Sequence, residues 1–150
     1  MSTKPSLSKR LAPIHQLAQG REDHAARQLA ESQRLLAQQE NQLLEMERYL
    51  SEYSEGRVGA AMAPALLANR EAFLRQLAEA LRWQSGAVAD ARQRLQQARE
   101  HWVGKHRDTD VLEHLIDRCH NDERRVQERR LQRELDEFAQ LRPAPSQMAG

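Results

Sequence analysis

The chain has 150 residues, of which 39% are hydrophobic, 30% are charged and only 4% are aromatic. This composition argues against an ordinary globular core, which depends on large aromatic and β-branched side chains, and is typical of long helices or a coiled coil. The formal net charge is +1, from 23 basic and 22 acidic residues, whereas a nucleic-acid binder needs a basic excess that neutralises phosphates. We therefore expect an all-α fold with a narrow core and no nucleic-acid partner.

A first long helix is expected over about residues 13–55, because Pro13 suits a first helical turn; a start nearer Ser6 is the alternative. The residues before it contain no apolar segment typical of a secretory signal. Within the helix, apolar residues at intervals of seven predict coiled-coil pairing. These residues are Leu29, Leu36, Leu43 and Leu50.

Helix-breaking residues then cluster at Gly56, Gly59 and Pro64, which predicts a turn over 56–63. A second helix is expected over about residues 64–141, and a heptad repeat again marks its core-facing side. The repeat consists of Leu67, Leu74, Leu81, Val88, Leu95 and Trp102.

The direct connection predicts that the two helices pack antiparallel, so that residues 1–142 form a single coiled-coil hairpin with a longer second helix. Folding about residue 60 would place residue i opposite about residue 120 − i. The second helix would then extend past the first beyond about Ile116, as a C-terminal overhang. Pro143 and Pro145 follow, and we expect a disordered tail over residues 143–150.

The overhang is charged on most sides yet retains four large apolar side chains. They are Val126, Leu131, Leu135 and Phe138. An isolated helix of this kind is only marginally stable in water. We therefore expect this segment to fray in the free protein and to complete its packing against another protein.

No residue pattern points to catalysis or to a cofactor. The chain has no phosphate-binding glycine loop and no nucleophile motif, and a two-helix seam offers no water-excluding pocket. The histidines and Cys119 lack the i, i+4 spacing of a helical zinc site, so we expect no metal. A single cysteine fits a reducing compartment, and no segment has the ~18–20 apolar residues of a membrane span. These features predict a cytoplasmic protein that is not an enzyme.

A second stripe of residues flanks the turn at 4–3–4 spacing on each helix, and antiparallel folding would bring its two halves together. Tyr and Met are enriched at the centres of protein interfaces, so the stripe is a candidate binding surface. The alternative, that its residues only thicken the seam, applies best to Met46 and Leu77. The stripe comprises Gln42, Met46, Tyr49, Tyr53, Phe73, Leu77, Ala80 and Gln84.

From about Leu17 to Arg142 the sequence resembles the FliJ family, the small coiled-coil component of the bacterial flagellar type III export apparatus. The order and spacing of several short segments carry the resemblance, and Pro64 and Gln84 depart from the family pattern. The segments are Glu22 to Arg27, Glu52-Tyr53, Asn69-Arg70 with Phe73, Trp102, and Leu135 to Gln140.

The resemblance implies a stalk like that of rotary ATPase γ subunits, with three partners: the export ATPase hexamer, the cytoplasmic domain of the export gate, and substrate-specific export chaperones. It also implies peripheral association with the inner-membrane export apparatus. The gate- and chaperone-binding residues would be the stripe that flanks the turn. The ATPase-binding end would be the N-terminal turns and the overhang, with Arg129, Arg133, Asp136, Glu137 and Phe138 as candidates.

Three other functions remain open from the sequence. The nearest is the equivalent stalk of a virulence type III secretion system. A second is a generic structural coiled coil that self-associates and buries the overhang and the stripe in a homodimer. An RNA-binding hairpin is the third, and the balanced charge disfavours it.

Overall fold

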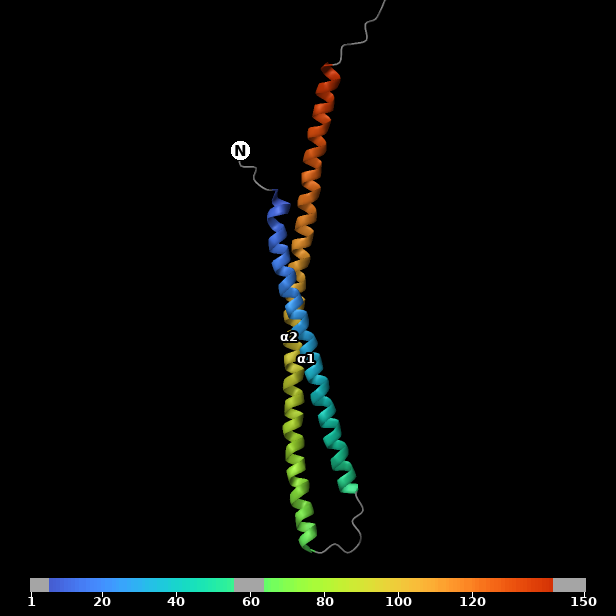
Figure 1. Cartoon of the computed structure of the whole chain (residues 1–150). Helices are drawn as coiled ribbons and strands as arrows, with labels where there is room; N and C mark the ends of the chain where they lie inside the picture. The colour runs from blue at the N-terminus through green and yellow to red at the C-terminus, as the bar shows by residue number, and fades with distance from the viewer. Residues whose placement is uncertain (1–5, 56–63, 142–150) are drawn as a thin grey trace, which may run out of the picture. The chain divides into compact units, whose positions relative to one another are not determined.

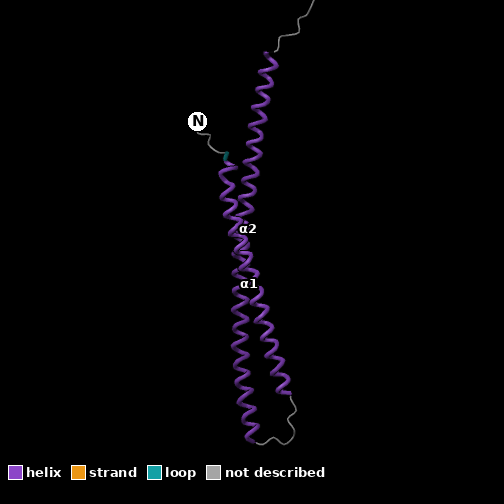
Figure 2. The backbone as a smooth tube through the Cα atoms, viewed as in Figure 1, coloured by secondary structure: helices purple, strands orange, loops and turns teal. Residues whose placement is uncertain are grey.

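The computed structural model describes residues 6–55 and 64–141, with side chains omitted at 64–66. These residues form two helices, α1 (Leu7–Glu55) and α2 (Pro64–Leu141), and no strand occurs among them (Figures 1 and 2). The helices pack against each other antiparallel and α2 is the longer, which confirms the expected hairpin. The turn expected over 56–63 and the tail expected over 143–150 lie outside the described residues.

The helix α1 begins at Leu7, so the expected start at residue 13 is wrong and the alternative start nearer Ser6 is right. Pro13 lies inside the helix, where proline removes one backbone hydrogen bond and disfavours the preceding turn. Two polar contacts support that turn. The Ser6 hydroxyl accepts a hydrogen bond from the Lys9 amide at 3.4 Å, as an N-cap does, and buried Ser8 is bonded to α2.

The chain divides into two compact units, each made from a segment of both helices. One unit contains residues 21–106, and the other contains residues 1–20 and 107–150. The expectation of a single domain over residues 1–142 stays a prediction.

In the unit of residues 21–106, the less exposed residues recur at alternating spacings of three and four on both helices. This pattern is the a/d seam of a coiled coil, so the heptad prediction is confirmed. The seam is narrow: Ala25 and Val88 are the buried apolar residues of this unit among those described, and the leucines at seam positions are half-buried. Leu67, which the heptad repeat also included, is instead 40% exposed. Most seam side chains therefore contact the partner helix on one side and solvent on the other.

In the unit of residues 1–20 and 107–150, polar contacts of Ser8 with Glu123 and of His15 with Glu113 join the helices. The Ser8 hydroxyl lies 2.9 and 3.0 Å from the carboxylate oxygens of Glu123, to which the Ser8 amide also donates at 3.3 Å. His15 Nε2 lies 3.1 Å from Glu113 Oε1. Glu123 is the last residue of α2 with a half-buried side chain.

The register differs from the expected one. In an antiparallel pair, the residue numbers of opposed residues add up to a constant, and the expected value was about 120. The observed contacts give values between 122, for Tyr49 with Phe73, and 132, for Glu40 with Arg92. The observed pairing is therefore shifted from the one that folding about residue 60 would give. As a result, α1 covers α2 up to Glu123, and the overhang begins after that residue instead of after Ile116.

Candidate partner-binding surfaces

The seam of residues 21–106 is bordered by two edges with different chemistry. We call one edge the tyrosine edge. Each of its residues comes immediately before a seam residue at heptad position a, which is Leu36, Leu43 or Leu50 on α1 and Leu74, Leu81 or Val88 on α2. The edge comprises Leu35, Gln42 and Tyr49 on α1, and Phe73, Ala80 and Ala87 on α2. The opposite edge carries charged contacts. Arg92 donates to Glu40 there at 3.4 Å, and His106 Nδ1 lies 2.7 Å from Glu22 Oε1. The two edges therefore present an apolar and an ion-paired surface.

Three aromatic rings of the predicted stripe come together at the end of the tyrosine edge. The centroids of Tyr53 and Phe73 are 4.7 Å apart, and Tyr49 lies 6.2 Å from each of them. The edge-to-face geometry of Tyr49 and Phe73, with ring planes at 69°, is a favourable one for aromatic pairs. The Tyr49 side chain remains 51% exposed, so this cluster is open to a partner.

Arg70 holds this cluster against the end of α1. Its Nη2 donates to the carbonyl oxygens of Tyr53 and Ser54 at 3.2 and 3.0 Å, and its guanidinium lies 6.0 Å from the centre of the Tyr53 ring. The last carbonyls of a helix have no partner within it, and a cation is favourable there. Sequence reasoning used Arg70 only as part of the family resemblance and missed this role.

The remaining stripe residues divide between seam and surface. Gln84 Nε2 donates to Gln39 Oε1 at 2.7 Å and to the Gln39 carbonyl at 3.0 Å, and Gln42 Oε1 lies 3.4 Å away. These contacts make Gln84 part of a polar layer in the seam. Met46 and Leu77 are half-buried at seam positions, whereas Ala80 is exposed. The binding role of the stripe as a whole stays a prediction.

The overhang, residues 124–141, is exposed throughout. Every candidate for ATPase binding lies on it: Arg129, Arg133, Asp136, Glu137 and Phe138. Figure 1 shows this end of α2, in red, continuing past the start of α1. Within the helix, Gln132 Nε2 donates a hydrogen bond to Asp136 Oδ1 at 3.1 Å.

The apolar residues of the overhang do not continue the seam. The seam positions after Glu123 are residues 126, 130, 133 and 137, and beyond Val126 they hold Arg130, Arg133 and Glu137. The apolar row instead comprises Leu131, Leu135 and Phe138, which are 57%, 62% and 67% exposed. Their i, i+4, i+7 spacing places them on one side of the helix, so the overhang presents a separate apolar side.

Trp83 is a surface residue that sequence reasoning missed. It is 77% exposed and lies between the seam residues Leu81 and Gln84, so that its side chain points outward. The sequence alone could have indicated it, because a large apolar residue between two seam positions has no partner on the other helix. It borders a hollow that is also lined by Gly86 and Asp90.

Within the described residues, no group of His, Cys, Asp and Glu could hold a metal ion. Hydrogen bonding and charge from Arg34 lower the pKa of the exposed Glu31 carboxylate. Neither described helix has a stretch long and apolar enough to cross a membrane.

Comparison with known proteins supports the earlier resemblance. The family model described as "Flagellar FliJ protein" matches residues 8–147, and no curated sequence matches the chain. The match covers nearly the whole chain and is to the flagellar family rather than to a virulence-type stalk. The chain belongs to the FliJ family and is a component of the flagellar export apparatus.

Proposed function

We propose that this protein is a non-enzymatic stalk that binds the flagellar export ATPase hexamer through its overhang and stimulates ATP hydrolysis. The observation that carries the proposal is the separate apolar row of the overhang, which no described part of the chain covers. Family membership supports a place in the export apparatus, and the overhang supplies a surface suited to a large partner.

The energetics favour a partner for this segment. Burying a Leu or Phe side chain contributes roughly 1.5–3 kcal/mol, so the row of Leu131, Leu135 and Phe138 offers several kcal/mol to a protein that covers it. A single helix of this length has little stability of its own. A partner that binds the overhang would bury the apolar row and would also stabilise the helix.

The charges of the overhang favour an oriented partner. Residues 124–133 contain five arginines and one glutamate, whereas residues 134–137 contain three acids and no base. Arg129 and Arg133 thus lie in a basic segment, and Asp136 and Glu137 lie in an acidic one. A binding site with complementary charges would accept the overhang in one orientation and reject the reverse.

Stimulation would not require a catalytic group from this chain. A ligand that binds the assembled hexamer and not its separate subunits favours the hexamer by mass action. The stripe that flanks the turn, part of which lies on the tyrosine edge, is in turn proposed to contact the export gate and the substrate chaperones. Two binding sites on one protein raise the effective concentration of the ATPase at the gate.

A steady-state assay of the cognate flagellar ATPase tests the proposal. The full chain should stimulate hydrolysis, and a chain that ends at Glu123 should not, although it keeps the Ser8–Glu123 contact. The double variant Leu131→Ser/Phe138→Ser should lose most of the stimulation. Leu44→Ser is a matched control, because Leu44 is 50% exposed and lies outside the overhang. Full stimulation by the chain that ends at Glu123 would refute the proposed contact.

A further inference from the structure

The tyrosine edge continues beyond the predicted stripe. On α1 it extends from Tyr49 back to Leu35, which is 36% exposed, and on α2 it extends from Phe73 forward to Ala87. The fourteen residue steps from Leu35 to Tyr49 span about 21 Å at 1.5 Å per residue. This is the length of about four helical turns, so the edge can hold far more than a single side chain.

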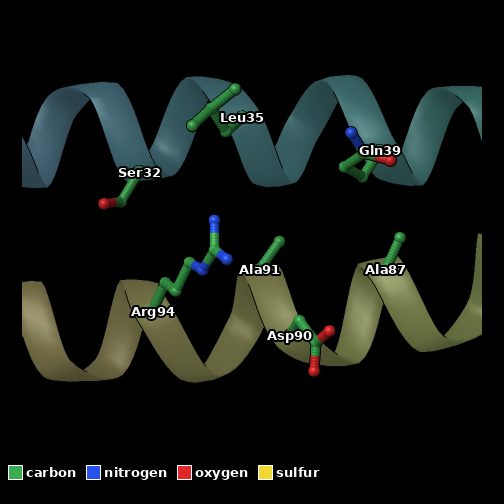
Figure 3. A pocket seen from close by; sticks show the side chains of 7 residues that line it. All are labelled: Ser32, Leu35, Gln39, Ala87, Asp90, Ala91 and Arg94. Atoms are coloured by element: carbon green, nitrogen blue, oxygen red, sulfur yellow. The ribbon is translucent and has the colours of Figure 1, made fainter.

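A groove occupies the far end of this edge (Figure 3). Ala87 and Ala91 point from α2 towards α1, and because both are small they leave space beside Leu35. The groove has a volume of about 200 Å³, and an apolar cavity of about 150 Å³ is known to accommodate benzene. It can therefore receive a large apolar side chain. Arg94 extends towards α1 and bounds the groove at its Ser32 end.

Trp83 enlarges the apolar surface next to the groove. It lies four residues before Ala87 and therefore on the same side of α2, and the two residues share a hollow with Asp90. An exposed tryptophan beside a groove is typical of residues that dominate binding energy. This end of the edge thus has a pocket and an adjacent aromatic anchor.

The rim of the edge is acidic. We define the rim as the residues three positions after each edge residue: Gln38, Glu45, Glu52, Gln76, Trp83 and Asp90. Three of these rim residues are acids, and none of them is basic. None of the three forms an ion pair with a described residue, and their side chains are free to meet an incoming charge. Three cations lie near the edge. Arg70 binds the carbonyls at the end of α1, Arg94 bounds the groove at its Ser32 end, and Arg82 lines the hollow beside Trp83.

We infer that the whole tyrosine edge, from Tyr49 and Phe73 to Leu35 and Ala87, is a docking groove for a basic amphipathic helix of another protein. Apolar side chains of that helix at i, i+3, i+4 and i+7 occupy the groove, and its flanking Lys or Arg residues face Glu45, Glu52 and Asp90. The inference rests on the proposed partner-binding role of the tyrosine edge. It extends that surface by one heptad on each helix and specifies the chemistry of the partner.

A pair of synthetic peptides provides the test. The first is an 18-residue amphipathic helix with leucines along one side and lysines on both flanks, and the second has glutamates in place of the lysines. Binding is followed by the fluorescence of Trp83 in a full-length Trp102→Phe chain. The lysine peptide should bind saturably with a blue shift, and roughly tenfold more tightly than the glutamate peptide, because several exposed charge pairs each contribute modestly.

Variants assign the site. Glu45→Gln/Glu52→Gln/Asp90→Asn should abolish most of the preference for lysine, whereas the control Glu47→Gln/Glu71→Gln/Glu100→Gln, away from this edge, should keep it. Ala87→Gln fills the groove and should weaken binding roughly tenfold. Ser85→Gln, on the opposite edge, should not. Circular dichroism verifies that each variant retains its helix content.

Three outcomes would overturn the inference: equal affinity for both peptides, unchanged binding by Ala87→Gln, or a concentration-dependent dimer that excludes the peptide. In the last case a second copy of this chain would be the occupant. Loss of binding in Tyr49→Ala but not in Ala87→Gln would leave the proposed function standing without the extension. Conversely, peptide binding together with absent ATPase stimulation would support the inference and refute the proposed ATPase contact.

Discussion

The contact between Ser8 and Glu123 explains how α1 continues through Pro13, and removing it should loosen the N-terminal turns. Ser8 is 3% exposed, and its hydroxyl donates to a carboxylate, a bond that contributes about 1.5–3 kcal/mol. Glu123 is only half-buried, which favours the lower end of that range. Alanine is the better helix former by up to about 0.7 kcal/mol. We therefore expect Ser8→Ala to destabilise this region by about 1 kcal/mol.

Amide hydrogen exchange over residues 11–20 measures this effect, because local opening of a helix end sets those rates. Exchange should become roughly fivefold faster in Ser8→Ala, as about 1 kcal/mol predicts. Glu123→Gln should have a similar effect, and the double variant should be less destabilised than the sum. The control Ser51→Ala loses a hydroxyl that makes only an exposed contact within α1. Unchanged exchange in Ser8→Ala relative to that control would refute the reasoning.

Three further predictions concern the seam, the end of α1 and the overhang. Replacing Gln39 and Gln84 together by Leu should raise the midpoint of thermal unfolding, because a polar layer lowers stability while it specifies register. Arg70→Ala should destabilise the last turn of α1 by about 1 kcal/mol, measured by hydrogen exchange. Leu131→Ser/Phe138→Ser should change the free energy of unfolding by less than about 0.5 kcal/mol per site, since both side chains are exposed.

Each of these has a result that would contradict it. A lower unfolding midpoint in the double leucine variant would mean that the polar layer stabilises the pair. Exchange in the last turn of α1 that does not respond to the loss of Arg70 would show that the carbonyls find other partners. A large loss of stability in the overhang variant would mean that its apolar row packs within the free protein.

The sequence predicts the helices and the seam well, because a heptad repeat over many turns leaves one consistent packing side. The expected bounds of α2 agree with the structure. The start of α1 was wrong because Ser8 is held by Glu123, 115 residues away, and no local pattern at Pro13 reveals that contact. The expected register was also wrong, because contacts between the helices, such as that of Tyr49 with Phe73, are not visible in the sequence of either helix alone.

The candidate site was predictable only in part. Spacing identified Tyr49, Tyr53 and Phe73, and the structure brings their rings together. Spacing could not show that Gln84 is engaged by Gln39, or that Arg70 caps α1, because both contacts cross between helices. The groove lies where Ala87 and Ala91 of α2 are opposite Leu35 of α1. Its position could not be predicted, because the expected register was wrong.

The central claim is that the overhang is the end that binds the export ATPase. Hydrogen exchange of residues 124–141, with and without the hexamer, tests it most directly. We predict fast exchange in the free protein, consistent with a marginally stable helix, and strong protection on addition of the hexamer, with little change over residues 74–95. Slow exchange of the free overhang, or no protection by the hexamer, would contradict the account.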